Sequence, residues 1–392
     1  MKQEFNCFEA KFIEQMMNNH QADHNIVVIK IKPFEVDNSA SILAVLASVN
    51  SQNLIGHYGL EIDFTRNGLP ERKKLVMKIK PHGDDIVNML NNLATACGLE
   101  LSAIYSQFKS ETGFQFTHLR EQEIYKNLKP VFTPEIYGLH TDELENNYLI
   151  LMEYLEDVEL LNSVIQPEKW TDKHIKTALK QMAEWHFKML KSNKQLSKSE
   201  IWKTDLPNLE YMTKLMPLWT ALLQNATDKF PELYTQERCG KIQNAINTIP
   251  IWGQELNELP KTLIHNDLNP RNTCFKVKNG DLKFCAYDWE LATFQIPQYD
   301  VAELLCFVLE EDRYNLRDEY VEFYRKELNQ LSGLYKNDVS FKQEFFWASL
   351  NFGIHRLGMY LMAHSVSPYP FLPRVVNSFF DSIKNENSIL LD

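Results

Sequence analysis

Residues His265-Asn266-Asp267-Leu268-Asn269-Pro270-Arg271-Asn272 and, after a short apolar stretch, Tyr287-Asp288-Trp289-Glu290 are the part of this sequence that decides the fold. Asn272 follows Asp267 in a segment that Pro270 keeps from becoming a helix, so the carboxylate and the amide are expected to face one small volume. An acid that can accept a hydroxyl proton, followed by an amide and a second acid that can bind magnesium, is the order that phosphoryl transfer from ATP requires. The alternative is a surface turn, because Asn, Asp and Pro are common turn residues.

The sequence on either side of this loop favours the catalytic interpretation. Thr262–Ile264 is predicted to be a buried strand, and residues 274–287 are predicted to form a hairpin that turns at Asn279-Gly280. Such a hairpin returns Asp288 to the side of Asn272, where both side chains offer hard oxygen ligands suited to magnesium ions that bridge ATP phosphates. A zinc or nucleophile site at His265 is another possibility, but the order and spacing fit it less well.

Together these motifs resemble those of the aminoglycoside phosphotransferase and choline kinase-like family, which consists of small-molecule kinases with a protein-kinase-like fold. Three further segments resemble parts of the same family: Glu184-Trp185-His186, Gln298-Tyr299-Asp300-Val301-Ala302 and His355-Arg356-Leu357-Gly358. The similarity spans roughly residues 45–365, and its most specific part runs from Leu263 to Glu290.

The resemblance implies a role for each matched residue. Asp267 would be the general base that orients the acceptor hydroxyl, while Asn272 and Asp288 would bind Mg²⁺. Two further residues would support the loop: His265, which would not itself react, and Asp300, which would hold the loop by hydrogen bonds. Two more would lie near the acceptor: Glu290, which alternatively belongs to the magnesium shell, and Arg356.

A kinase of this type also needs a lysine on an interior strand to neutralise the ATP phosphates and a helical glutamate to position that lysine. Lys78 and Lys80 point to the same face of a predicted strand, because strand side chains alternate. Lys78 is preferred, since the apolar run before it matches the family's pattern. Glu121 is the preferred glutamate because it shares a helical face with apolar residues, and Glu123 is the reserve.

The nucleotide-binding elements are less distinct in the sequence. No Gly-x-Gly-x-x-Gly motif occurs, and residues 47–53 occupy the expected place of the phosphate loop, where backbone amides and the hydroxyl of Ser48 or Ser51 would contact phosphate. The segment from Glu153 to Leu155 is expected to cross between the lobes and to offer backbone hydrogen bonds to adenine.

The order of the predicted elements indicates an α+β protein with a protein-kinase-like two-lobe fold. Residues 1–155 are expected to form an N-terminal nucleotide-binding lobe, an antiparallel sheet with a helix, in which residues 1–25 are a possible added helix. Residues 156–392 are expected to form a mostly helical C-terminal lobe that carries catalysis and acceptor binding. The predicted strands are Ile26–Ile31, parts of Ser41–Val49, Tyr58–Phe64, Leu75–Ile79 and Tyr148–Met152. The predicted helices are Leu119–Leu128, His174–Leu190, Leu209–Phe230, Glu237–Ile249, Val301–Glu310, Arg317–Leu328 and Phe341–Ala363.

Composition limits the classes of partner. The chain has 392 residues, 44% of them hydrophobic, and a formal net charge of -11, which argues against a nucleic acid or an anionic membrane as partner. Six cysteines without a Cys-x-x-Cys pair and a start that lacks a signal-peptide core predict free thiols in the cytoplasm. The sequence gives no indication of oligomeric state.

These observations predict Mg²⁺-dependent transfer of phosphate from ATP to a hydroxyl group of a small molecule such as an amino alcohol, a sugar, an aminoglycoside or another natural product. A pseudokinase or nucleotide-binding scaffold is the main alternative, although it would not need the base and both metal ligands. A protein kinase is less consistent with the sequence, because the glycine loop is missing and the short stretch between Asp288 and Tyr299 contains no evident activation segment. The aromatic residues of the C-terminal lobe fit either a pocket for an amine or an ordinary core: Trp202, Tyr211, Trp219, Trp347 and Tyr360.

Overall fold

The computed structural model describes residues 6–21, 24–36, 54–196, 200–202 and 207–384, and these residues divide into two compact units. Unit 1 comprises residues up to Ile86 together with Phe116–Val158, and unit 2 comprises Val87–Gln115 together with the chain from Glu159 onward. The predicted boundary at residue 155 is close to the second division, but residues 87–115, which were expected in the N-terminal lobe, belong to unit 2.

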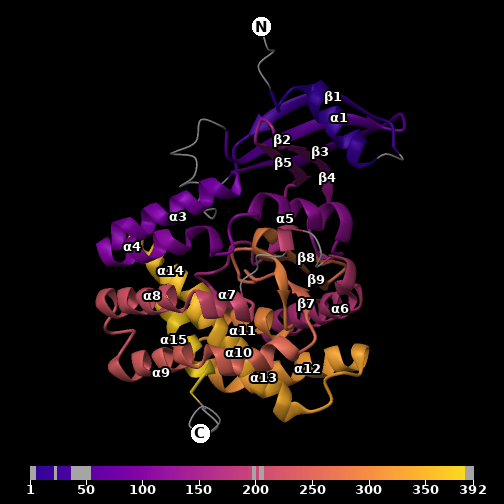
Figure 1. Ribbon diagram of the computed structural model, residues 1–392. Coiled ribbons are helices and arrows are strands. Elements are labelled where there is room, and N and C mark those ends of the chain that lie inside the picture. Colours follow the sequence, from indigo (N-terminus) through magenta and orange to yellow (C-terminus); the bar gives the residue numbers. More distant parts are fainter. Residues whose placement is uncertain (1–5, 22–23, 37–53, 197–199, 203–206, 385–392) are drawn as a thin grey trace. The chain divides into compact units, whose positions relative to one another are not determined.

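Unit 1 is built on an antiparallel sheet with the strand order β1-β2-β3-β5-β4 (Figure 1). The strands are β1 (Ile26–Phe34), β2 (Gly56–Arg66), β3 (Leu69–Lys80), β4 (Ile136–Asp142) and β5 (Asn147–Glu153). The predicted strands at 26–31, 58–64, 75–79 and 148–152 are therefore confirmed, as is the turn at Asn67-Gly68 that joins β2 to β3. The strand predicted within Ser41–Val49 lies outside the described residues.

A helix covers one face of this sheet. α1 (Ala10–His20) packs against β1 and β4 and buries Ile13, Met16 and Met17 in a core shared with alternate residues of β3. The approach is close, because a Cβ atom on Gly138 of β4 would lie 2.8 Å from Cγ of Met16. The helix expected within residues 1–25 is therefore part of the core of unit 1.

The second helical element of unit 1 is α5 (Thr117–Glu123), which runs into a π-helical turn over Ile124–Leu128 and so accounts for the helix predicted at 119–128. α3 (Gly83–Cys97) begins in unit 1 and continues into unit 2, where it is followed by α4 (Leu99–Phe108). Both helices were missed in the sequence, although Ile86, Leu90 and Leu93 recur at helical spacing and are buried. α4 packs against α8 (Met216–Lys229) within unit 2.

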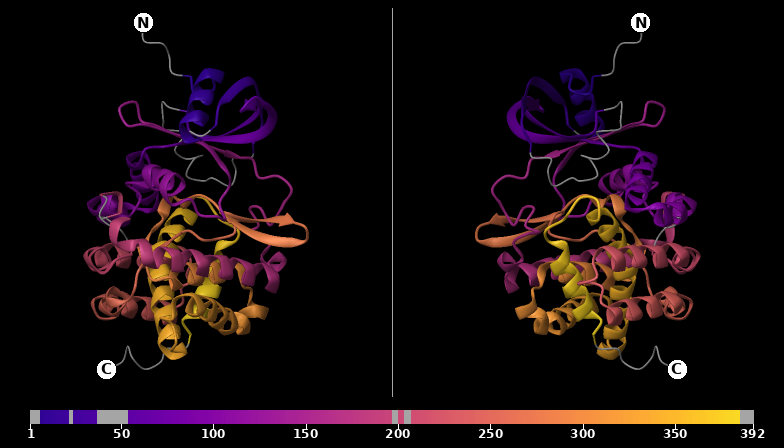
Figure 2. Two further views of the ribbon diagram at one scale, coloured as in Figure 1. Left: turned by 90° about the vertical axis from the view of Figure 1, so that its right-hand side faces the viewer. Right: turned by 90° about the vertical axis from the view of Figure 1, so that its left-hand side faces the viewer.

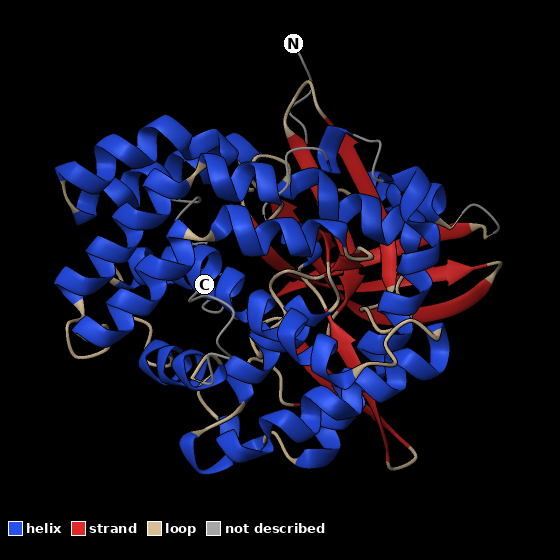
Figure 3. Ribbon diagram, turned by 60° about the horizontal axis from the view of Figure 1, so that its bottom comes forward, coloured by secondary structure: helices blue, strands red, loops and turns tan. Residues whose placement is uncertain are grey.

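Unit 2 is mostly helical, as predicted (Figure 3). Its other helices are α6 (Asp172–Leu196), α7 (Leu209–Lys214), α9 (Gln236–Asn247), α10 (Ile249–Glu258), α11 (Gln298–Val308), α12 (Arg317–Ser332), α13 (Asp338–Phe352), α14 (Gly358–His364) and α15 (Leu372–Ser382). The helix predicted at 209–230 is divided at Leu215, just before Pro217 in the first turn of α8. The helix predicted at 341–363 contains a π-helical turn over Gly353–Leu357 between α13 and α14.

Short strands lie among these helices. β7 (Thr262–Ile264) pairs with β10 (Thr293–Gln295), and β8 (Thr273–Lys278) and β9 (Asp281–Ala286) form the predicted hairpin, which projects from the helices of unit 2 (Figure 2). β6 (Val158–Glu159) is a two-residue strand at the point where the chain passes from unit 1 to unit 2. None of the helices in the described residues combines the length and the apolar composition that crossing a bilayer would need.

Candidate active site

The predicted site residues fall into two groups, one in each unit. Lys78, Glu121, Glu153 and Leu155 belong to unit 1, and the others belong to unit 2, except for Ser48 and Ser51, which lie outside the described residues. Each group is described by itself below.

The lysine group of unit 1 lies where β3 becomes fully buried. Because side chains alternate along the strand, Met77 and Ile79 join the core beneath α1, whereas Lys78 and Lys80 share the opposite face. Both ammonium groups donate to the same carboxylate oxygen, Oε2 of Glu121, at 2.7 Å from Lys78 and 2.5 Å from Lys80. The structure thus joins Glu121 to both candidate lysines.

Glu121 is fully buried, and its second oxygen Oε1 accepts a hydrogen bond from the Tyr125 hydroxyl at 3.1 Å. The reserve residue Glu123 instead accepts from the amide of Asn127. Two ammonium groups held by one buried carboxylate are cations of the kind that can bind an anionic phosphate group. Glu153 ends β5 and accepts a hydrogen bond from the backbone of Glu135, while Leu155 is half-buried in the segment that follows.

In unit 2, Asp300 holds the beginning of the loop that carries Asp267. Its carboxylate, at the start of α11, accepts hydrogen bonds from the backbone N–H of His265 at 2.8 Å and of Asn266 at 2.9 Å, and it lies 3.1 Å from Nε2 of His186. The ring of His265 packs on Trp289, and its Nε2 lies 2.9 Å from the carbonyl oxygen of Tyr287, which can only accept. These contacts place His265 in a supporting position.

Asp267 is almost fully buried, and its two carboxylate oxygens have different partners. Oδ1 accepts from Nη2 of Arg356 at 2.6 Å, from the Tyr360 hydroxyl at 2.6 Å and from Asn269 at 3.0 Å, whereas Oδ2 accepts from the Asn272 amide at 2.7 Å. Burial by itself would raise the pKa of Asp267. The charges of Arg356 and Arg271 and the hydrogen bond from Tyr360 outweigh burial, and the pKa lies below its usual value. The carboxylate is therefore ionised at neutral pH and can accept a proton or orient a hydroxyl.

Three of these partners come from parts of the chain to which the sequence assigned other roles or none. Arg356 lies in the π-helical turn before α14, a kind of distortion that is frequent at functional sites. Tyr360 follows one turn later and was considered only as an aromatic residue of a pocket or core. Arg271 lies within the loop itself, and its Nη2 donates to the Tyr360 oxygen at 2.7 Å.

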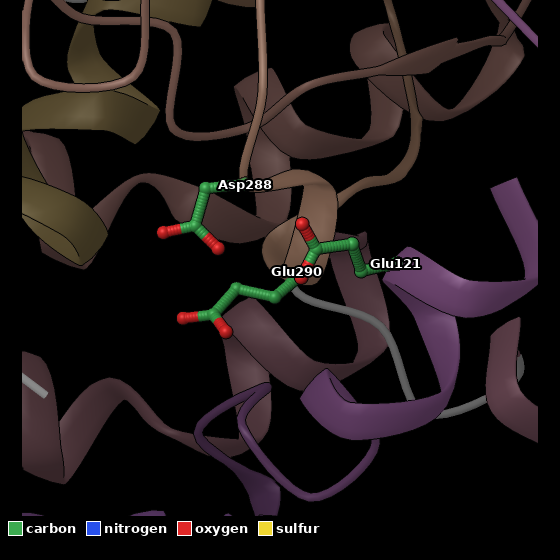
Figure 4. A group of neighbouring side chains, drawn as sticks. All are labelled: Glu121, Asp288 and Glu290. Atoms are coloured by element: carbon green, nitrogen blue, oxygen red, sulfur yellow. The ribbon is translucent and has the colours of Figure 1, made fainter. Parts of the chain in front are cut away.

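The hairpin places the predicted magnesium ligands together. Thr273 of β8 pairs with Ala286 of β9, and the N–H of Tyr287 donates to the carbonyl of Asn272 at 3.0 Å, so Asp288 follows directly beside Asn272. Asp288 adopts a left-handed conformation with φ 64°, and carboxylate oxygens of Asp288 and Glu290 lie within 4.8 Å of each other. Both side chains extend toward the same side of the loop (Figure 4). Two carboxylates and an amide oxygen are the hard donors that magnesium prefers, so these residues fit the ion.

One further acid, Glu303, interacts with the charges of Asp267 and Arg356 and was not singled out in the sequence. Glu303, one turn beyond Asp300 on α11, is fully buried, and neither of its carboxyl oxygens has a hydrogen-bond partner among the described residues. Burial, reinforced by the charge of Asp267, raises the pKa of Glu303 to about 8. Glu303 is therefore mainly protonated at neutral pH.

Comparisons with known proteins bear on the fold and on the family of the chain. A search of curated proteins found no match. Among solved structures, the Plasmodium vivax ethanolamine kinase Pv091845 is similar at 12% identity with a TM-score of 0.50, over 90% of this chain and 82% of that one. A GDP and kanamycin complex of APH(2")-IIia gives 11% identity and a TM-score of 0.48, over 95% and 98% of the two chains. At this identity the first similarity bears on the fold alone, and it confirms the predicted kinase-like fold.

The family model described as "Phosphotransferase enzyme family" matches residues 113–334, which is more than half of the chain. The matched segment includes Glu121, the loop with Asp267 and Asn272, and Asp288. The resemblance inferred from the motifs is thereby confirmed, and the chain belongs to the phosphotransferase enzyme family.

Proposed function

We propose that this protein is a kinase that transfers the γ-phosphoryl group of ATP to a hydroxyl group of a small molecule. The observation that carries the proposal is the state of Asp267, a buried carboxylate that stays ionised and whose Oδ2 is fixed by Asn272. A charged carboxylate held in this way can orient an acceptor hydroxyl and accept its proton during in-line attack.

Magnesium would be held by Asn272 and Asp288, with Glu290 at the edge of the site. When bound there, it would offset the negative charge that develops on the transferring phosphoryl group. Lys78 and Lys80, both held by Glu121, would bind the phosphates of the nucleotide. Asp300 would keep Asp267 in place through the loop backbone. Most of the rate enhancement would come from positioning of the reacting groups. We also propose a cytoplasmic protein that has neither a nucleic-acid nor a membrane partner, and we place the adenine-binding backbone at 153–155.

The test is a screen of ATP consumption against hydroxylated amines, sugars and hydroxy acids, in which ³¹P NMR identifies the new phosphate ester. Turnover is expected to require magnesium and to stop when EDTA is added. Nucleotide binding without formation of any ester would instead support the scaffold alternative. Phosphate on Ser or Thr of added proteins, with none on small molecules, would indicate a protein kinase.

A further inference from the structure

The side chain of Arg271 is fixed next to the base without an ion pair of its own. Nε donates to Oδ1 of Asn269 at 3.3 Å, Nη2 donates to the Tyr360 oxygen, and the guanidinium lies over the rings of Tyr360 and Phe371, at 5.1 and 5.4 Å from their centroids. In the part of the chain that the structure describes, no carboxylate lies within 4.0 Å of Arg271, and its Nη1 makes no hydrogen bond. A planar, oriented guanidinium with a free edge matches an oxyanion.

Arg271 lies close to the position expected for the acceptor hydroxyl. The Tyr360 oxygen bonds both Nη2 of Arg271, at 2.7 Å, and Oδ1 of Asp267, at 2.6 Å. Nη2 of Arg271 and Oδ1 of Asp267 are therefore at most about 5.3 Å apart. A ligand that presents a hydroxyl to Asp267 and an anionic group to Arg271 would carry the two groups within a few bonds of each other.

The charged groups around Arg271 do not balance the positive charge at this place. Arg271 and Arg356 face one ionised carboxylate, Asp267, because Glu303 is mainly protonated, and Nε of Arg356 is buried without a hydrogen-bond partner among the described residues. Asp300 is engaged by the loop backbone. This local excess of positive charge occurs in a chain with a formal net charge of -11. A second anion would balance it.

We infer that the acceptor carries an oxyanion, a carboxylate or a phosphate, that binds Arg271 a few bonds from the hydroxyl that is phosphorylated. This inference rests on the proposed function and narrows its acceptor class to hydroxy acids and their phosphate counterparts. It also explains why a rigid arginine occupies the loop immediately before Asn272. An amine acceptor would instead meet two guanidinium groups of its own sign at this side of Asp267.

The first arm of the test uses acceptor pairs that differ in the anion. Glycerate and gluconate carry a carboxylate, glycerol 3-phosphate carries a phosphate, and glycerol and glucose are their neutral counterparts. In at least one pair, kcat/KM with Mg-ATP is expected to be at least about tenfold higher for the anionic member, as one charge-assisted hydrogen bond would give. Arg271→Gln should bring that ratio to within about twofold, whereas Arg271→Lys should keep part of it.

The matched control is Arg238→Gln, because Arg238 also lies over an aromatic ring, Phe380 at 4.4 Å, but belongs to α9. That variant should leave the ratio unchanged. If Arg271 merely tuned Asp267 or contacted the nucleotide, Arg271→Gln would lower kcat equally for both members of a pair. This equal loss, or a preference for neutral or amine acceptors, would overturn the inference.

The second arm measures binding without turnover, and it separates this inference from the proposed function. Malonate and inorganic phosphate are titrated into the wild-type chain by calorimetry, and Arg271→Gln should weaken the binding of at least one of them about tenfold or more. Tighter binding of malonate would point to carboxylate acceptors and tighter binding of phosphate to phosphorylated ones. Absent binding, or equal affinity in the variant, would overturn the anion site. Arg271-dependent binding in a protein without ATP turnover would contradict the proposed function and support the site.

Discussion

Asp300→Asn is predicted to loosen the loop that carries Asp267, without removing any group that is proposed to touch a substrate. Asp300 is fully buried, and its two oxygens accept hydrogen bonds from consecutive backbone N–H groups, those of His265 and Asn266. An asparagine of the same shape has one acceptor oxygen, and its NH₂ group would face the other N–H as a second donor.

The size of the effect follows from that mismatch. A hydrogen bond to a charged group contributes about 1.5–3 kcal/mol, and a buried N–H left without a partner costs about 1–3 kcal/mol. Since these two figures describe the same lost interaction, they are not added, and the free energy of unfolding should fall by about 1.5–3 kcal/mol. A loop displacement of about 1 Å would lower kcat about 100-fold.

The assay combines urea unfolding, followed by tryptophan fluorescence, with kcat measured under conditions where the variant is folded. The control is Asp318→Asn, an exposed acid on α12, for which a change within about 0.5 kcal/mol is expected. The reasoning would be refuted if Asp300→Asn stayed within the same limit and kept its kcat.

Three further predictions concern other buried groups. Glu121→Gln should lower the free energy of unfolding by about 3–5 kcal/mol, because two buried lysines lose a shared carboxylate; a urea-measured loss below about 1 kcal/mol would speak against this. Tyr360→Phe removes a hydrogen bond that lowers the pKa of Asp267, so the acid limb of the pH profile of kcat/KM should move to higher pH; an unmoved limb would contradict the assignment. The pKa of Glu303 is higher in the folded than in the unfolded protein. The contribution of Glu303 to stability is therefore fully present at pH values below its ordinary pKa of 4.5, and it is lost as the pH rises through about 8. Glu303→Gln should therefore gain stability relative to wild type between pH 5 and 8 in thermal unfolding, and a difference that is constant over this range would count against a buried neutral glutamate.

The features that could be predicted from the sequence are those determined by residues close together in the chain. The hairpin at 274–287 follows from alternating apolar residues around Asn279-Gly280, and its register alone brings Asp288 beside Asn272. Lys78 and Lys80 share a face because strand side chains alternate. The preference for Glu121 over Glu123 came from helical spacing, and the structure shows Glu121 bonded to both lysines.

The features that the sequence did not predict depend on contacts distant in the chain. Arg356 and Tyr360 reach Asp267 across 89 and 93 positions, and only the packing of α14 and of the π-helical turn before it reveals these contacts. The neutral state of Glu303 likewise depends on burial, which its position in an apolar helix did not specify. α3 and α4 were missed for a different reason. Their apolar residues recur with a helical period in the sequence, but the strand-rich pattern around them masked it.

The most direct test of the account is Mg-ATP turnover by Asp267→Asn, measured together with the affinity for the nucleotide. Loss of the base should lower kcat about 10²–10⁴-fold, while the Kd for ATP changes by less than about threefold. Asp312→Asn, an exposed acid elsewhere in unit 2, should match the wild-type protein in both measurements. Unchanged turnover in Asp267→Asn would contradict the central claim that this carboxylate orients and deprotonates the acceptor hydroxyl.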